Sequence, residues 1–284
     1  MTCYKYCMSA RRKIMLTEKM KTITESVTNN DVMKKAFLWK IRNFEPKVRL
    51  CIDSKRFLIK TAENSRELEK ALDLRYSVFY RESLNRETIS KVDVDRFDLV
   101  CDHLLVIDKS AGRIAGTYRL ISSTFSDKFY SETEFMIDDL KRANGIKLEL
   151  GRACVHRDYR TGAAIALLWK GMSEYVKAVG AQYLFVCSSI STTNAIEIGL
   201  IYKYVKELYL SEESLRVYPK DKYRVKELEH YLEAFEKFDI KAEAIDEYIP
   251  ALLKSYFKAG SVICGEPALD RKFKCADFLT VLDL

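Results

Sequence analysis

The stretch that decides the fold is residues 148–169, which read LELGRACVHRDYRTGAAIALLW. It begins with the alternation of a strand, continues through a turn rich in arginine and closes on an apolar run with helical spacing. Alternation puts Glu149 on the same strand face as the small residues Gly151 and Ala153, which leaves open space beside its carboxylate. The stretch therefore predicts a strand, a basic turn and a helix, with one carboxylate placed before the turn.

Glu149 is a candidate general base, because a carboxylate on a central strand beside open space can accept a proton from a bound group. A structural ion pair with Arg119 or Arg152 is the alternative, and the residues by themselves leave both open.

The turn that follows is a candidate anion site. The first turn of a helix offers N–H groups without intrahelical acceptors and the positive end of the helix dipole. Arg157 and Arg160 add charge, and Thr161, Gly162 and Ala163 complete a turn that a phosphate can approach closely. A surface turn with solvated arginines is the alternative. The turn is not a P-loop, since the chain has no GxxxxGK[ST].

Outward from this stretch, the pattern indicates strands and helices in alternation. Strands are expected at 56–62, within 101–121 on both sides of a turn at 109–112, at 182–190 and near the C-terminus, and helices at 62–84, 161–180, 195–210 and 249–260. Residues 205–249 are charged and rich in tyrosine, and are interpreted as an insertion or lid. The predicted class is α/β (α+β), with a mixed central sheet flanked by helices.

The charge is concentrated at the N-terminus. Residues 1–60 hold 15 Lys and Arg against 5 Asp and Glu, while the other 224 residues are near neutral. Met33, Phe37, Ile41 and Phe44 fall on one helical stripe, which suits a helix on an anionic membrane surface. A helix packed on the main domain is the alternative. The expected division is a basic arm at 1–55 and a catalytic domain at 56–284.

Composition excludes several protein classes. No apolar run reaches the length of a membrane-spanning helix, and the first residues lack the apolar core of a signal peptide. The 8 cysteines are irregularly spaced without a CxxC pair, which favours buried free thiols in a reducing cytoplasm over disulfides or zinc. His103 and Asp108 match an HxxxxD acyltransferase pattern, but on one strand they would lie about 17 Å apart on opposite faces.

A second candidate site combines an acidic loop with three arginines. The set, called here the acidic-loop set, consists of Arg75, Asp93, Asp95, Asp98, Arg119 and Arg152. The loop lacks the central glycine and distal glutamate of an EF-hand, so calcium is disfavoured. Binding of a positively charged substrate amine, pairing of the aspartates with the arginines, and a solvated acidic loop all remain open.

Several motifs in a fixed order resemble the N-acyltransferases of ornithine-lipid synthesis, often labelled putative hemolysins, within the GNAT-like superfamily. They are RYSVFYRE (75–82), DVDRFD (93–98), CDHLLV (101–106), AGTYRLI (115–121), LELGRACVHRDYR (148–160), ALLWKGM (166–172) and GEPALDRKFKCADFLTVLDL (265–284). The same features are distantly similar to acyl-homoserine-lactone synthases. The resemblance covers residues 56–284 and implies a GNAT-like sheet with a splayed strand pair at the acyl-donor site.

The resemblance implies transfer of a long, often 3-hydroxylated acyl chain from acyl carrier protein to the α-amine of an amino acid, with ornithine the leading acceptor. It implies that Glu149 is the base, that the acidic-loop set contacts the amino acid, and that the turn at 157–163 holds the phosphopantetheine phosphate. Acyl carrier protein supplies that phosphopantetheine, so no separate cofactor, no metal and no nucleic acid are expected. The glycine after Arg160 comes one position earlier than in a standard acetyltransferase loop, which disfavours acetyl-CoA as donor.

Other acceptors and one other class of protein are kept as alternatives. An N-acyl amino acid synthase or an acyl-homoserine-lactone-type synthase would use another amine. A non-enzymatic, hemolysin-like membrane-active protein would need an apolar amphipathic run that the sequence lacks. The expected location is the cytoplasm, peripheral at the inner face of the cytoplasmic membrane.

Overall fold

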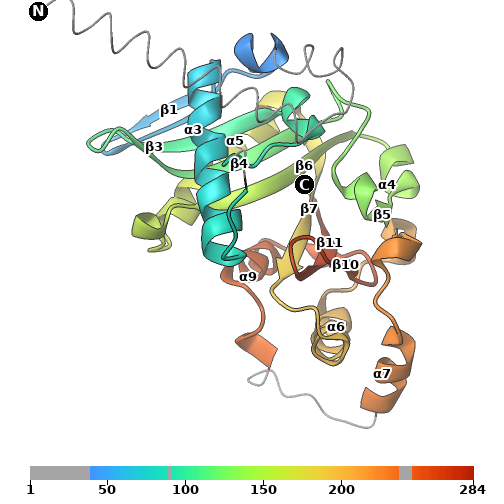
Figure 1. The fold of residues 1–284 in the computed structure, drawn as a ribbon. Coiled ribbons are helices and arrows are strands. Elements are labelled where there is room, and N and C mark those ends of the chain that lie inside the picture. Colours follow the sequence, from blue (N-terminus) through green and yellow to red (C-terminus); the bar gives the residue numbers. More distant parts are fainter. Residues whose placement is uncertain (1–38, 89–90, 237–244) are drawn as a thin grey trace, which may run out of the picture. The chain divides into compact units, whose positions relative to one another are not determined.

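The structure is a computed structural model that describes residues 39–88, 91–236 and 245–284. The chain forms two compact units (Figure 1). Unit 1 contains the chain up to Arg119 together with Arg152–Met172, and unit 2 contains Leu120–Gly151 and Ser173–Leu284. Two strands, β4 (Arg113–Ser122) and β6 (Ile146–Val155), and the helix α5 (Ala163–Val179) continue from one unit into the other.

The sheet of unit 1 is antiparallel. Its order is β1 (Cys51–Ser54), β2 (Phe57–Thr61), β3 (Asp102–Asp108) and β4. The pairs β1–β2 and β2–β3 are antiparallel. Between β2 and β3 lies α3 (Ser65–Tyr76), which begins where the Asn64 side chain accepts the N–H groups of Arg66 and Glu67. Asparagine is a favoured residue at this position because it satisfies N–H groups that the helix leaves unpaired.

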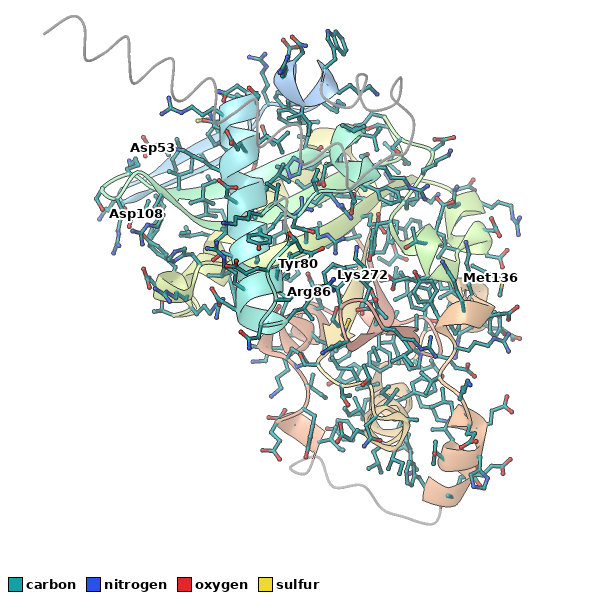
Figure 2. The ribbon with its side chains drawn as sticks, viewed as in Figure 1. Asp53, Tyr80, Arg86, Asp108, Met136 and Lys272 are labelled. Carbon is teal, nitrogen blue, oxygen red and sulfur yellow. The ribbon has the colours of Figure 1, made fainter. Side chains whose placement is uncertain are left out.

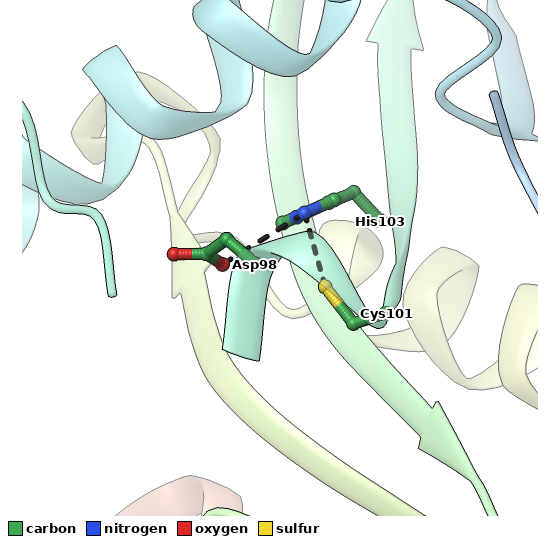
Figure 3. A group of neighbouring side chains, drawn as sticks. All are labelled: Asp98, Cys101 and His103. Atoms are coloured by element: carbon green, nitrogen blue, oxygen red, sulfur yellow. Dashed lines mark hydrogen bonds and ion pairs between the residues drawn. The ribbon is translucent and has the colours of Figure 1, made fainter. Parts of the chain in front are cut away.

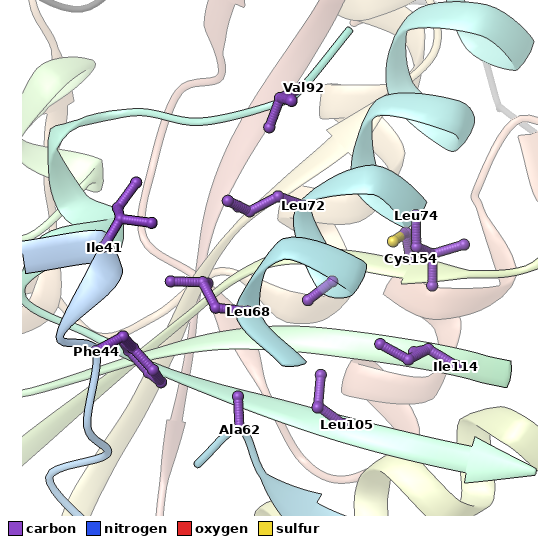
Figure 4. Packing of buried hydrophobic residues seen from close by; sticks show 11 residues of the cluster. Ile41, Phe44, Ala62, Leu68, Leu72, Leu74, Val92, Leu105, Ile114 and Cys154 are labelled. Atoms are coloured by element: carbon purple, nitrogen blue, oxygen red, sulfur yellow. The ribbon is translucent and has the colours of Figure 1, made fainter. Parts of the chain in front are cut away.

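Helices cover both faces of this sheet. On one face, Leu68 and Leu72 of α3 pack in a buried cluster with Leu105, Ile114 and Cys154 (Figure 4). On the other face, α5 approaches so closely that a Cβ on its Gly171 would lie 2.7 Å from Ile59 and 2.9 Å from Leu104. Successive side chains of a strand point to opposite faces of the sheet. Leu104 therefore faces α5, and Leu105 faces α3.

Residues 39–54 belong to unit 1. Ile41 and Phe44, expected on a membrane-facing stripe, are buried in the cluster around α3. The Asp102 carboxylate accepts the N–H groups of Lys47 and Val48 at 2.7 and 2.8 Å. Ile41 and Phe44 therefore pack on the main domain, which was the alternative to a membrane-facing helix. This packing against α3 removes their apolar area from water, which stabilises the fold. Met33 and Phe37, the rest of the predicted stripe, lie outside the described residues.

The sheet of unit 2 is mixed, which confirms the predicted α/β class. The β6 strand runs parallel to β7 (Ala181–Ile190) from Ile146 to Leu150, and β7 is antiparallel to β11 (Cys275–Asp283). Antiparallel partners of β11 are β10 (Ala268–Asp270) and β9 (Val262–Ile263). The splay of β6 from β7 beyond this pairing stays a prediction.

The helices of unit 2 follow the sequence pattern closely, with one addition in the irregular stretch before β6 and one helix, as expected, in the segment interpreted as a lid. They are α4 (Asp138–Arg142), α6 (Ala195–Tyr209), α7 (Leu228–Phe235) and α9 (Ala251–Lys258). A two-stranded sheet of β5 (Phe135–Met136) and β8 (Tyr218–Pro219) was not expected. The segment 205–249 begins inside α6 and contains α7 among its described residues, and its role as a lid is untested.

The six cysteines in the described part of the chain are free thiols, as expected, and four of them are buried. None of the helices among the described residues has both the length and the apolar composition needed to cross a membrane.

Candidate active site

The predicted turn and helix start are present in unit 1. After β6, a 3₁₀ turn at Arg157–Tyr159 leads to α5, which begins at Ala163. Gly162 has a φ of +80°, in the left-handed region that favours glycine. A Cβ at Gly162 would meet nothing within 4 Å, so open space surrounds the backbone there. The first N–H groups of α5 therefore stand at an uncrowded surface, as an anion site requires.

The two arginines of the turn have different surroundings. Arg160 lies 2.6 Å from the Glu82 carboxylate, and its Nε donates to the Val155 carbonyl at 3.1 Å. The Arg157 side chain is 76% exposed. Arg160 thus fixes the turn against neighbouring residues, whereas Arg157 reaches into solvent.

Hydrogen bonds anchor the turn to the sheet of unit 1. The Tyr159 hydroxyl donates to the Asp108 carboxylate at 3.0 Å, at the end of β3 where Figure 2 labels Asp108. Arg56 and Ser110 donate to the same carboxylate. These bonds hold the pKa of Asp108 well below its ordinary value. Asp108 is therefore a structural carboxylate, and the HxxxxD interpretation is excluded by its partners as well as by strand geometry.

A basic groove of about 860 Å³ opens beside the turn. Its charged lining residues are Lys70, Asp73, Arg81, Lys91, Arg113, Arg157 and Asp158, all of unit 1. Five of these are cationic and two anionic, so the groove suits an anionic partner.

The acidic-loop set forms a buried network of ion pairs in unit 1. Arg75 donates to Asp93 at 2.8 Å and to Asp98 at 2.6 Å. Arg119 donates to both oxygens of Asp95 at 2.8 Å, and Arg152 to one of them at 3.1 Å. The aspartates thus pair with the arginines, and the loop is not simply solvated.

Burial and charge act in opposite directions on this network. Burial by itself lowers the pKa of Arg75, but Asp93 and Asp98 raise it above its ordinary value. Burial raises the pKa of Asp93, but Arg75 and Arg152 hold it below its ordinary value. The Arg75 and Asp98 side chains are at most 1% exposed, whereas Asp95 is 24% exposed. Asp95 is therefore the most exposed group of the network, followed by Arg152 at 11%.

Arg152 interrupts the regular conformation of β6. Its φ is +51°, in the left-handed region, where a residue with a Cβ is strained. Such a residue breaks the alternation of a strand and redirects the adjoining backbone N–H and C=O groups, as in a β-bulge. The strain lies three residues after Glu149, at the point where β6 passes from unit 2 into unit 1.

Glu149 is 2% exposed and held by the backbone of unit 2. Its two carboxylate oxygens accept the N–H groups of Tyr130 and Ser131 at 2.6 and 2.7 Å. These bonds fix the orientation of the carboxylate and hold the segment around residue 130 against the strand. Arg119 and Arg152, the two arginines considered as ion-pair partners of Glu149, each pair with Asp95. The ion pair with Glu149 stays an untested alternative.

Asp98, Cys101 and His103 have the composition of a catalytic triad (Figure 3). The Cys101 sulfur lies 3.2 Å from His103 Nε2, and the same nitrogen lies 3.8 Å from Asp98. In a relay the two ring nitrogens would serve different partners. Burial and the nearby Asp98 raise the pKa of the Cys101 thiol well above its ordinary value, and burial with Arg75 lowers that of His103. This buried group is therefore not a nucleophile site.

Two buried carboxylates of unit 2 were not among the residues predicted from the sequence. Glu134 is 0% exposed and Asp277 is 4% exposed. The available signal was their context, since Glu134 precedes FMI and Asp277 lies within the apolar strand CADFLTVL. Lone carboxylates in such runs are rarely buried without a partner.

Comparison with known proteins adds independent findings. Residues 74–170 match the model of an acetyltransferase (GNAT) domain. An L-ornithine N(alpha)-acyltransferase from Rhodobacter capsulatus is 30% identical over 243 residues, which are 79% of this chain and 89% of that protein. This chain belongs to the L-ornithine N(alpha)-acyltransferase family. It is therefore an acyltransferase.

A second relative agrees in extent. The L-ornithine N(alpha)-acyltransferase from Brucella abortus is 30% identical over 249 residues, 80% of this chain and 84% of that protein. The solved structure of an N-acyl amino acid synthase from uncultured soil microbes has a TM-score of 0.46 at 9% identity, covering 81% of this chain and 93% of its own. The region that matches the acetyltransferase domain contains the acidic-loop set, Glu149 and the turn at 157–163.

Proposed function

We propose that this protein transfers a long acyl chain, often 3-hydroxylated, to the α-amine of ornithine and so makes lyso-ornithine lipid. The observation that carries the proposal is the match to relatives named L-ornithine N(alpha)-acyltransferase over 89% of the Rhodobacter protein's length. The strand, basic turn and helix start supply a matching site, with an open backbone at Gly162 beside the exposed Arg157.

Acyl carrier protein is the donor in this proposal. Its phosphopantetheine has a single phosphodiester, which the first N–H groups of α5 and Arg157 would bind. The basic groove next to Arg157 supports this choice, because its five cationic side chains face a strongly acidic partner. Arg160 would act indirectly, by holding the turn through Glu82 and Val155.

Glu149 acts as the general base. An α-ammonium must lose one proton before its nitrogen attacks, and Glu149 accepts that proton directly or through a water. The amine then attacks the thioester carbonyl and a tetrahedral intermediate forms. As the C–S bond breaks, the new amide nitrogen loses a second proton, which passes to the sulfur, and the carrier leaves as its thiol. Each Glu149 oxygen accepts one backbone N–H, and these two bonds hold the carboxylate in a fixed orientation for the proton transfer.

Two further groups complete the mechanism. Backbone N–H groups turned out of register by the left-handed Arg152 would stabilise the developing oxyanion. The Asp95 end of the acidic-loop set would contact the amino acid, while Arg75, Asp93 and Asp98 hold Asp95, Arg119 and Arg152 in place.

An anionic membrane surface is the proposed location of the reaction. The product is an amphiphile that must enter a lipid layer, and the basic N-terminal region offers electrostatic attraction to anionic lipids.

The donor and acceptor are tested with purified full-length protein. Acyl carrier protein thioesters and acyl-CoA thioesters of matched chain length are each incubated with ornithine, glycine, glutamine and lysine, and products are identified by mass spectrometry. N-acylornithine from the carrier protein thioester is expected to dominate. Acylornithine formed only from acyl-CoA would overturn the donor, and acylation of another amine would overturn the acceptor.

The base is tested with Glu149→Gln. Loss of a general base costs about 10²–10⁴ in rate. This loss should shrink as pH rises, because a free α-amine needs no base once it is deprotonated in solution. Circular dichroism and Tm control for the two backbone hydrogen bonds at Tyr130 and Ser131. A rate loss that is the same at every pH would show that Glu149 is structural.

A further inference from the structure

One face of the sheet in unit 2 carries a row of polar groups that extends from Glu149. Glu149 on β6 pairs with Phe185 on β7, and Cys187 faces the same way two residues later. Ser189, two residues further, pairs with Asp277 on β11. Glu149, Cys187 and Asp277 therefore lie on the same face of three neighbouring strands, with Cys187 between the two carboxylates.

The segment around residues 129–134 covers this face. The Phe129 ring packs edge-on against Phe185 at 5.0 Å, and the next two residues donate their N–H groups to Glu149. The segment ends at Glu134, which is 0% exposed. Among the residues that the structure describes, no cationic side chain pairs with Glu134, and its polar neighbours are the Tyr130 side chain and the Asp277 carboxylate. A fully buried carboxylate in this state is costly unless a cation or a proton neutralises it.

Glu134 and Asp277 lie close enough to share one positive charge. Burial and the Asp277 carboxylate raise the pKa of Glu134 to about 9. Burial also raises the pKa of Asp277, although Ser189 donates to it. Burial together with Glu134, Asp277 and Glu149 raises the pKa of the Cys187 thiol well above its ordinary value, which places that neutral thiol among all three carboxylates. At neutral pH the pair holds a proton in the place that a cationic ligand would occupy.

The outer wall of this group is part of the segment that sequence analysis interpreted as a lid. The N–H of Lys220 donates to the Glu134 carbonyl at 2.7 Å. Tyr223 follows on the same 3₁₀ turn and is half-buried. Burial and the charges of Glu134, Asp270 and Asp277 raise the pKa of the Tyr223 hydroxyl. Tyr223 therefore lies near these carboxylates and is itself partly exposed to solvent.

We propose that Glu134 and Asp277 bind the side-chain ammonium of the diamino-acid acceptor, with Cys187 and Tyr223 beside it. The inference rests on the proposed function. It explains how the enzyme would acylate the α-amine of the acceptor and not its side-chain amine. An ammonium held by two buried carboxylates keeps its proton and cannot attack the thioester. The α-amine is then left at Glu149, which takes its proton. Positions on the strands place the Cα atoms of Glu149 and Asp277 roughly 16 Å apart, a span that two acidic side chains and an extended diamine fill together.

A divalent metal ion fits the same residues less well. Ligand atoms of Asp270, Cys275 and Asp277 lie within 4.8 Å of one another. Asp270, however, already accepts the N–H groups of Lys272 and Phe273 at 2.7 and 3.1 Å. Burial and Asp277 raise the pKa of the Cys275 thiol far above its ordinary value, so it stays protonated and is a poor ligand.

The test compares ornithine with norvaline, which has the same carbon chain without the side-chain amine. The variants are Glu134→Gln and Asp277→Asn in the full chain, with Glu132→Gln as matched control, since Glu132 lies on the same 3₁₀ turn but is 31% exposed. We expect the unaltered protein to prefer ornithine by on the order of 10²-fold or more in kcat/KM. Glu134→Gln and Asp277→Asn should remove most of this preference by lowering kcat/KM for ornithine, and Glu132→Gln should leave it unchanged.

Three results would overturn the inference while leaving N-acylation of ornithine intact. They are equal use of norvaline and ornithine by the unaltered protein, equal loss on both substrates in Glu134→Gln and Asp277→Asn, and a rise in Tm with Zn²⁺ or Mg²⁺ but not with ornithine. The first comparison needs no variant, so it decides the matter even if both variants fail to fold. Failure to acylate any amino acid would instead overturn the proposed function.

Discussion

At the scale of single residues, the partners of a buried carboxylate separate those that hold the fold from those that we propose for chemistry. Asp93 and Asp98 are buried and form ion pairs with Arg75, which offsets their negative charges. Glu149 is buried but oriented by two backbone donors. Glu134 is buried beside a second carboxylate, Asp277, without a cationic partner among the described residues, which is the costliest of the three states.

Replacing Arg75 should destabilise the protein strongly. Arg75→Ala leaves Asp93 and Asp98 buried without their shared partner, and breaking a buried pair costs about 3–5 kcal/mol. The free energy of unfolding from urea titration measures the loss. The control is Arg81→Ala, whose pair with Glu87 is 49% and 67% exposed and should contribute about 0–1 kcal/mol. Similar losses in the two variants would show that the network is not structural.

Glu134 should make stability depend on pH. Its pKa of about 9 in the folded protein exceeds the ordinary value of 4.5, so the folded state keeps a proton that the unfolded chain releases. This contribution is fully present below about pH 4.5 and is lost as the pH rises toward about 9. The advantage in unfolding free energy of Glu134→Gln over the unaltered protein should therefore grow from pH 5 to pH 9. A difference that does not change with pH would contradict the assignment.

At the scale of elements, the turn between β6 and α5 combines a fixed part and an exposed part. Tyr159 and Arg160 are bonded to Asp108 and Glu82, whereas Arg157 is mostly in solvent. Gly162 supplies the left-handed conformation that lets α5 begin immediately afterwards. Anchoring and ligand contact are thus carried by different residues of one short turn.

The two arginines of this turn should behave differently when replaced. Arg157→Ala should raise the KM for acyl carrier protein severalfold and weaken its salt dependence without changing Tm, since an exposed charge acts mainly on encounter and docking. Arg160→Ala should also lower Tm, because it releases the turn from Glu82 and Val155. Steady-state kinetics at low and high salt with calorimetry test both. A larger effect of Arg157→Ala on the KM for ornithine would contradict its placement at the donor.

At the scale of the whole molecule, a boundary at residue 56 would separate residues 39–54 from the unit to which they belong. Residues 39–54 contribute Ile41 and Phe44 to the core of unit 1 and β1 to its sheet. Residues 1–38 carry 8 Lys and Arg against 3 Asp and Glu.

Two truncations should separate core packing from membrane binding. A variant lacking residues 1–38 should stay folded and active on soluble donor, but sediment less with anionic vesicles at low salt, since each basic residue contributes about 1 kcal/mol near such a surface. A variant beginning at Lys55 should lose about 3–6 kcal/mol of stability, because Ile41 and Phe44 are removed from the core. If the full-length protein ignores anionic vesicles, its basic charge serves another partner.

The sequence by itself determined the local elements and the family. Alternation in LELGRACV and helical spacing in AAIALLW predicted β6 and α5, and the motif order predicted membership in the ornithine N-acyltransferase family. These features depend on near neighbours in the chain, so periodicity and motif spacing are enough to read them.

Only the tertiary structure decided which charges are paired and which apolar residues are buried. It paired the acidic loop with Arg75, Arg119 and Arg152, placed Ile41 in a core and brought Glu134 beside Asp277, 143 positions later in the chain. Such contacts join residues far apart in sequence, and their energies depend on distance and burial, neither of which a linear pattern contains.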